Sequence, residues 1–137
     1  CVAFLQAKIS SGIELITEYI RFKEIIREAD LVITGEGRID RQTLFGKVPV
    51  GIAHIAASQH IPVIAITGQV ETDAETDKQL LQAGLSAIFP IHPAPVSLEE
   101  AMHPNYAFRN IRRTIEQTCR TLLIFVNKKD INTDHKI

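Results

Sequence analysis

The chain has 137 residues, and its 15 Lys and Arg against 16 Asp and Glu give a formal net charge of −1. This length predicts a single domain, and the lack of positive charge argues against a nucleic-acid partner. Mean hydropathy is +0.06, and no apolar run approaches the roughly 18 residues that a membrane-spanning helix needs. The two cysteines form no CxxC pattern, which predicts a reducing, cytoplasmic setting.

Helical patterns dominate the first thirty residues. The spacing of apolar side chains predicts a helix over 2–8, a break at "SSG", and helical segments in "GIELITEYI" and "RFKEIIREA". The run "DLVITG" (30–35) is rich in branched residues and ends in glycine, which predicts a buried strand. Because the chain opens on Cys1 with a sequence typical of a helix interior, we expect it to be a fragment of a longer protein.

The remaining elements alternate between helix and strand. Helices are predicted over 48–60, 73–84 and 105–126, with a short capped helix at Ser97, and strands over 61–68 and 85–91. Strands without polar alternation, separated by helices, indicate a mostly parallel sheet with helices on both faces. We therefore expect a three-layer α/β fold of the flavodoxin or Rossmann type over 1–126, followed by a polar tail at 127–137.

Two of the predicted strands end in the same way. "VITGEG" and "AITGQV" place a Thr-Gly pair at 34–35 and again at 67–68. In a parallel sheet both pairs should lie at the carboxyl edge, where open α/β sheets bind their ligands. Glycine at that edge lets the backbone approach a ligand closely. Gln69 and His92 follow strands at the same edge and are further candidate contacts.

The stretch "TGEGRIDRQTLFGK" (34–47) gathers ionisable side chains between glycines after the first strand. Lys47 precedes a predicted helix start, whose unpaired N–H groups and dipole favour an anion, and Arg38 adds a second cation. Asp40 and Glu36 suit a substrate hydroxyl or a magnesium ion. The competing interpretation is a solvated loop in which adjacent opposite charges pair with one another.

Known nucleotide-binding motifs do not fit this stretch. Eight residues separate Gly37 from Gly46, so the Walker pattern is absent. The dinucleotide pattern G-x-G-x-x-G fails at Asp40, and no acidic residue follows about 20 positions later, which disfavours a nicotinamide site. Elsewhere, Cys119 is expected in the core, and His54 on the surface or in the core rather than in catalysis.

The sequence "ADLVITGEGRIDRQTLFGKVPVGIAHIA" (29–56) resembles the central signature of the bacterial glycerate kinase family, of the glycerate 2-kinase type. The segments "PVIAITG" and "AGLSAIFPIHPAPVSLEEAM" are similar to that family too, whereas "TGQV" departs from the Gly-Ser-Leu common at that place. The resemblance covers about residues 1–126. The positions that match the signature are Thr34, Gly35, Glu36, Gly37, Arg38, Asp40, Gln42, Thr43, Gly46, Lys47, Pro49 and Gly51.

This resemblance implies a two-domain enzyme that transfers the γ-phosphoryl group of ATP to D-glycerate with Mg²⁺, and this chain would be its C-terminal part, inactive alone. It implies Lys47 and Arg38 as contacts for phosphate or the glycerate carboxylate, and Asp40 as the base or hydroxyl-orienting group. Glu36 and Asp40 would hold the magnesium ion, or Glu36 would instead be a structural partner of Arg38. The substrate- and nucleotide-binding residues would be Thr34, Gly35, Glu36, Gly37, Gln42, Thr43, Gly46, Thr67 and Gly68.

A second hypothesis comes from another class of protein. The chain would then be a noncatalytic α/β module that binds an anionic small molecule or a partner chain. If the chain is a fragment, apolar surface should be uncovered, and self-association through it is expected.

Overall fold

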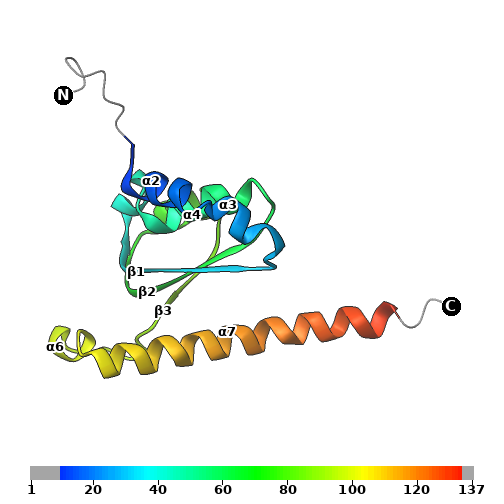
Figure 1. The fold of residues 1–137 in the computed structure, drawn as a ribbon. Helices are drawn as coiled ribbons and strands as arrows, with labels where there is room; N and C mark the ends of the chain where they lie inside the picture. Colours follow the sequence, from blue (N-terminus) through cyan, green and yellow to red (C-terminus); the bar gives the residue numbers. More distant parts are fainter. Residues whose placement is uncertain (1–9, 134–137) are drawn as a thin grey trace, which may run out of the picture. The chain divides into compact units, whose positions relative to one another are not determined.

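The computed structural model describes residues 10–133, and their contacts group into two compact units that divide between Phe89 and Pro90 (Figure 1). The helix predicted over 2–8 lies outside the described residues. None of the described helices is both long and apolar enough to cross a membrane.

Two short helices open the first unit. α2 (Gly12–Tyr19) begins at a capping box, in which the Ser11 hydroxyl accepts the Glu14 N–H at 3.2 Å and the Glu14 carboxylate accepts the Ser11 N–H at 3.1 Å. α3 (Phe22–Ile25) and the 3-10 helix η1 (Ile26–Glu28) follow at once. These caps and apolar spacings are local, so the helical segments predicted here are confirmed.

A three-stranded sheet follows these helices, with the spatial order β1-β2-β3. β1 (Val32–Asp40) and β2 (Val63–Glu71) pair in parallel from Val32↔Val63 to Asp40↔Glu71, and β3 (Leu85–Pro90) is the third strand. The predicted α/β class with a parallel sheet is therefore confirmed. However, β1 and β2 both continue past their Thr-Gly pairs, so they are longer than the apolar runs predicted.

Helix α4 (Val48–Ala57) packs on β1 and β2, and α2 packs on α4, so these helices lie on one side of the sheet (Figure 1). Pro49 stands in the first turn of α4, as predicted. α4 and α2 approach closely at Gly51, where a Cβ would lie 2.6 Å from the Ile13 side chain. The largest fully buried apolar side chains around this layer are Ile39, Leu80, Val50, Val63 and Pro49.

The 3-10 helix η2 (Arg41–Phe45) and α5 (Ala74–Gln82) complete the first unit. The Asp73 carboxylate caps α5 by accepting the Thr76 backbone N–H at 2.7 Å. Gly84 follows the end of α5 with φ +107°, a left-handed conformation that favours glycine. This confirms the predicted stop of the helix.

The second unit consists of α6 (Leu98–Ala101) and the 30-residue helix α7 (Pro104–Thr133). The Ser97 hydroxyl accepts the Glu100 N–H at 3.2 Å, as its predicted cap requires. The predicted end of the last helix at 126 was wrong, because α7 continues to Thr133. No proline or glycine follows Pro104 in the sequence, so nothing local stops the helix. Residues 134–137 of the predicted tail lie outside the described part.

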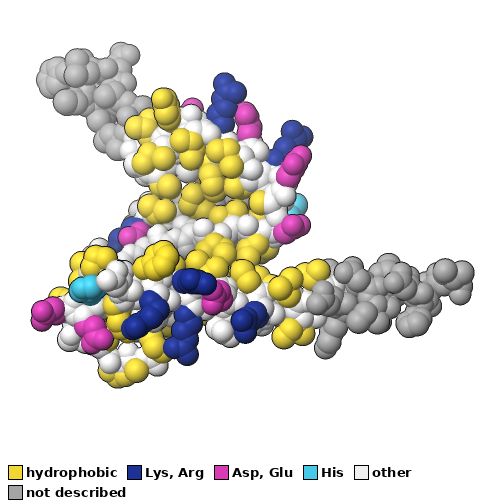
Figure 2. All heavy atoms as spheres, turned by 60° about the horizontal axis from the view of Figure 1, so that its bottom comes forward, with side chains coloured by type: hydrophobic (Ala, Val, Ile, Leu, Met, Phe, Trp, Pro, Cys, Tyr) yellow, Lys and Arg dark blue, Asp and Glu magenta, His cyan; other side chains and the backbone are white. Residues whose placement is uncertain are grey.

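Large apolar side chains remain exposed on α2, on α3 and at Ile20, which caps the end of α2. Tyr19 is 88% exposed and Leu15 65%, and three further residues of this face are Ile16, Ile20 and Ile25. Hydrophobic side chains are prominent on the surface shown in Figure 2. The uncovered apolar surface expected from the sequence is therefore present, and we call these five residues the α2–α3 apolar face.

Candidate functional site

The charged stretch lies on a strand and not on a loop. Glu36, Arg38 and Asp40 all belong to β1, where alternation places them on one face of the strand. The sequence "GEGRID" was expected to form a loop after the strand, and this prediction was wrong, because these residues belong to β1. β2 supplies the reason, since it runs beside β1 as far as Glu71 and satisfies its backbone.

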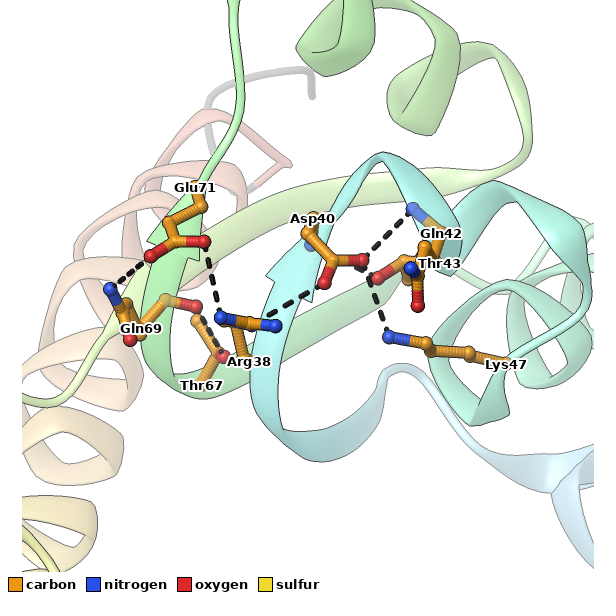
Figure 3. Close-up of polar contacts among 8 residues, drawn as sticks. All are labelled: Arg38, Asp40, Gln42, Thr43, Lys47, Thr67, Gln69 and Glu71. Carbon is orange, nitrogen blue, oxygen red and sulfur yellow. Dashed lines mark hydrogen bonds and ion pairs between the residues drawn. The ribbon is translucent and has the colours of Figure 1, made fainter.

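Asp40 is the centre of this cluster (Figure 3). Its Oδ1 lies 3.2 Å from the Lys47 Nζ and accepts the Gln42 backbone N–H at 2.9 Å. Its Oδ2 lies 3.4 Å from the Arg38 Nε. The Asp40 side chain is only 13% exposed, against 35% for Lys47 and 54% for Arg38. The structure thus brings together the three residues predicted to be catalytic. It does not show the competing interpretation, a solvated loop in which only adjacent opposite charges pair.

These contacts change the acidity of Asp40. Partial burial raises the pKa of its carboxyl, but the Lys47 hydrogen bond and charge, the Gln42 N–H and the Arg38 charge together outweigh burial. The net result is a pKa below the usual value for aspartate. Asp40 is therefore an ionised hydrogen-bond acceptor at neutral pH and a weak base.

The turn after β1 places Lys47 next to Asp40. Asp40 caps η2 through the Gln42 N–H, while the Thr43 hydroxyl accepts the Asp40 N–H at 3.1 Å. Thr43 is fully buried, and Gly46 ends the turn with φ +86°. The observed contacts of Gln42, Thr43 and Gly46 thus shape the turn, and their predicted contacts with a ligand stay predictions.

Lys47 is the N-terminal cap residue of α4, as its predicted place before a helix required. No side chain caps that helix end. The first N–H groups of a helix carry partial positive charge, although Pro49 supplies none. The Lys47 ammonium group and this helix end therefore give the cluster a positive side.

The Thr-Gly pairs lie inside the strands, which corrects their predicted place at the edge of the sheet. Thr34 pairs with Ala65 in the register, so the two threonines are not neighbours across the sheet. Thr67 is 1% exposed, and its hydroxyl donates to the Gln69 carbonyl at 3.0 Å. A Cβ on Gly68 would lie 2.6 Å from the Gly37 carbonyl oxygen.

These glycines therefore let β1 and β2 approach each other. For Gly35 a Cβ would come 3.4 Å from the Ile66 carbonyl oxygen, an ordinary contact with the same neighbouring strand. These glycines were predicted to let the backbone approach a ligand, but in the structure they let the backbones of β1 and β2 approach each other. The predicted ligand contacts of Thr34, Gly35, Gly37, Thr67 and Gly68 stay predictions.

The expected magnesium ligands do not form a common site. Glu36 and Asp40 stand four residues apart on β1, which separates them by about 13 Å in an extended strand. Both Asp40 oxygens already face cations or N–H donors. Among the side chains that the structure describes, no three from His, Cys, Asp or Glu gather where they could hold a metal ion. These residues therefore do not fit a protein-held Mg²⁺ ion.

Sequence reasoning missed Glu71, at the end of β2. Its Oε2 lies 3.3 Å from the Arg38 Nη1, and its Oε1 accepts the Gln69 side-chain N–H at 2.6 Å (Figure 3). Glu71 pairs with Asp40 in the register. The similarity of the two strands could have revealed it. If both strands are taken to continue past their Thr-Gly pairs, the sequence "GQVE" places Glu71 beside Asp40.

The other candidates lie apart from this cluster in the chain or in their contacts. His54 is exposed on α4, and Cys119 is half-buried on α7. His92 belongs to the second unit, where its ring stacks on Tyr106 with centroids 5.6 Å apart. A hollow of about 540 Å³ is also part of that unit. It is lined by Ser97, Glu99, Glu100, His103, Asn105, Tyr106 and Arg109, none of which belongs to the Asp40 cluster.

Several curated proteins similar to this chain are named glycerate kinases. The glycerate kinase of Bacillus subtilis (strain 168) is 40% identical over 121 residues, which are 88% of this chain and 29% of the relative. The glycerate 2-kinase of Escherichia coli (strain K12) is 41% identical over 123 residues, or 90% of this chain and 31% of the relative. The chain thus spans about 30% of the length of these relatives.

A solved structure agrees in fold. The crystal structure of a protein assigned as glycerate kinase 2 from Salmonella typhimurium LT2 matches with a TM-score of 0.65 and 37% identity. The match covers 92% of this chain and 30% of that chain. The model of the glycerate kinase family matches residues 1–123. The chain therefore belongs to the glycerate kinase family.

Proposed function

We propose that this chain carries part of the substrate site of an ATP-dependent kinase that phosphorylates D-glycerate. The observation that supports this proposal is the Asp40 cluster, in which Arg38 and Lys47 approach one carboxylate at 3.4 and 3.2 Å. The cluster stands at the carboxyl end of β1, beside the start of α4. Ligands of open α/β sheets bind at that edge, and the names of the relatives give the substrate.

Each residue of the cluster has a chemical role in this proposal. Phosphoryl transfer needs positioning and the neutralisation of charge more than a strong base. Arg38 binds the glycerate carboxylate, because a guanidinium matches a carboxylate in a planar, two-bonded contact. Lys47 neutralises the charge of the transferred group. Asp40, with its lowered pKa, orients the attacking hydroxyl by accepting its hydrogen bond.

The proposal includes ATP as the donor and Mg²⁺ as its companion ion. Mg²⁺ in kinases is bound by one or two carboxylates together with the phosphates of the nucleotide. The described residues supply no cluster of three metal ligands, so the ion would come bound to ATP. We propose further that residues 1–137 alone turn over negligibly, because they span only about 30% of the relatives. A cytoplasmic location stays a prediction.

The α2–α3 apolar face favours a second candidate function, a noncatalytic module that associates through this face with another chain. Apolar surface is worth about 25 cal/mol for each Å² removed from water, so exposed side chains such as Tyr19 drive association. The partner in this candidate is a second copy of the chain.

A chimera tests the kinase proposal. Residues 1–123 would replace the matching segment of the Bacillus subtilis glycerate kinase, and ADP release would be measured with ATP, Mg²⁺ and D-glycerate. We expect the chimera to be active, and Lys47→Ala to lower kcat/KM about 100-fold or more, as for other lost contacts to a charged transition state. Lys23→Ala, at an exposed lysine of α3, is the matched control and should change little.

Two results would count against the proposal. One is a chimera that folds, judged by near-UV circular dichroism, yet releases no ADP with glycerate. The other is a loss of less than about tenfold for Asp40→Asn, which would remove Asp40 from the reaction. In parallel, the 137-residue chain alone should release no more ADP than a sample without protein.

A further inference from the structure

Glu71 holds Arg38 from the neighbouring strand. Its Oε2 lies 3.3 Å from the Arg38 Nη1, while Gln69 donates to its Oε1 at 2.6 Å. Figure 3 shows Gln69, Glu71, Arg38 and Asp40 as one continuous row of contacts across β1 and β2. Each Glu71 oxygen thus has a donor, and the side chain that supplies the second donor stands two residues before Glu71 on the same strand.

The two carboxylates that face Arg38 contact different nitrogens. Asp40 faces the Nε at 3.4 Å and Glu71 faces the Nη1 at 3.3 Å. Two contacts at different nitrogens restrict the plane of the guanidinium, which one contact would leave free to rotate. A guanidinium has five N–H donors, so others remain available beyond these two contacts. Arg38 is 54% exposed, which leaves those donors accessible to a ligand.

The charges of the cluster select the kind of ligand. Arg38 and Lys47 contribute two positive charges, and Asp40 and Glu71 contribute two negative ones, so the four side chains sum to zero. A dianion such as inorganic phosphate, bound at Arg38, would face the carboxylates of Asp40 and Glu71, which both contact that guanidinium. A hydroxy acid fits better, because its single carboxylate can bind Arg38 while its hydroxyls donate to the carboxylates.

We infer that Glu71, braced by Gln69, is a positioning residue that orients Arg38 to receive the carboxylate of a small hydroxy acid. This inference rests on the proposed function, since it assigns the substrate carboxylate to Arg38. An exposed ion pair without such a role contributes little to stability. Loss of Glu71 should therefore change the order of Arg38 and the binding of substrate, and leave the fold intact.

Two variants separate the contact from the charge. Glu71→Asp keeps the charge but shortens the side chain by one methylene, about 1.5 Å, which breaks the contact with Arg38. Glu71→Gln keeps the length and removes the charge. Glu75→Gln on α5 is the matched control, because Glu75 is an exposed acid whose hydrogen bond is to Gln79.

The first readout is the Arg38 Nη1–H signal in ¹⁵N NMR spectra of the 137-residue chain, because Nη1 is the nitrogen that Glu71 contacts. We expect its exchange with water to be at least about threefold faster in Glu71→Asp and Glu71→Gln, because weakly held side chains exchange faster, and unchanged in Glu75→Gln. Unchanged exchange in both Glu71 variants would overturn the positioning role, whatever the chimera does.

The second readout is the kinetics of the chimera. We expect Glu71→Asp to raise the KM for D-glycerate about fivefold or more and to leave kcat within about twofold, as for a lost binding interaction. Faster Arg38 exchange with an unchanged KM would overturn the assignment of the carboxylate to Arg38. A chimera without any activity would count against the proposed function, and the NMR result would still decide the positioning role.

Discussion

Gly37 and Gly68 meet across β1 and β2, but only one of them has room for a methyl group. A Cβ on Gly68 would lie 2.6 Å from the Gly37 carbonyl oxygen, whereas a Cβ on Gly37 would have nothing within 4 Å. Carbon and a carbonyl oxygen pack at about 3.3–3.6 Å. Gly68→Ala would therefore force the two backbones apart by roughly 0.7–1 Å, and Gly37→Ala would not.

The cost follows from two opposing effects. Overpacking of a close-packed region costs about 1–3 kcal/mol. Alanine in place of a strand glycine recovers about 0.5–1 kcal/mol, because the unfolded chain has less freedom to lose. We expect Gly68→Ala to lower the free energy of unfolding by about 1–2 kcal/mol, and Gly37→Ala to leave it unchanged or raise it by up to about 1 kcal/mol.

Urea unfolding of the 137-residue chain, followed by circular dichroism, measures both values on one scale. Gly37→Ala is the matched control, because it makes the same chemical change on the facing strand. The reasoning is refuted if Gly68→Ala unfolds at the urea concentration of the unmodified chain. Equal destabilisation by both substitutions would refute it too, since that would point to a general intolerance of side chains here.

Two further predictions concern the charged cluster and the apolar face. In ¹³C NMR titrations the Asp40 carboxyl should titrate below 3.8, the usual value for aspartate, and Lys47→Ala should move its midpoint upward. Because the pKa of Asp40 is lowered in the folded state, Asp40 stabilises the fold at pH values above its unfolded pKa. This stabilisation is lost as the pH falls through the folded pKa. An unchanged midpoint in Lys47→Ala would contradict the assignment of the lowered pKa to Lys47. In sedimentation velocity the chain should self-associate. Tyr19→Ser should reduce association, while Leu81→Ser, at an exposed leucine of α5 outside the α2–α3 apolar face, should not. A monomeric chain at high concentration would contradict the second candidate function.

Local chemistry explains what could be predicted from the sequence. The Ser97 cap, Pro49 in a first turn and Gly84 after a helix each depend on residues within a few positions, and all three were found as predicted. The strand over Val63–Thr67 could also be predicted, because a strand that is buried on both faces appears in the sequence as a continuous apolar run. Together these signals were sufficient for the order of elements and for the α/β class.

Pairing between distant segments explains the rest. β1 continues to Asp40 and β2 to Glu71, because each strand supplies the hydrogen-bond partners of the other. No local pattern in "GEGRID" predicts this continuation. The register is also nonlocal, so it could not be predicted that Glu36 would pair with Thr67. The contact between Glu71 and Arg38 depends on that register, which is why the sequence pointed to Arg38 but not to the acid that holds it.

The exposure of the two cations separates their roles within the cluster. Lys47 is 35% exposed and lies 3.2 Å from Asp40, whose side chain is 13% exposed. Arg38 is 54% exposed and makes longer contacts, at 3.3 and 3.4 Å. Charge pairs weaken as water reaches them, so an incoming anion competes more easily for Arg38 than for Lys47. Under the proposed function, Arg38 is suited to the first contact with the substrate carboxylate, and Lys47, which lowers the pKa of Asp40, helps to keep that carboxylate ionised.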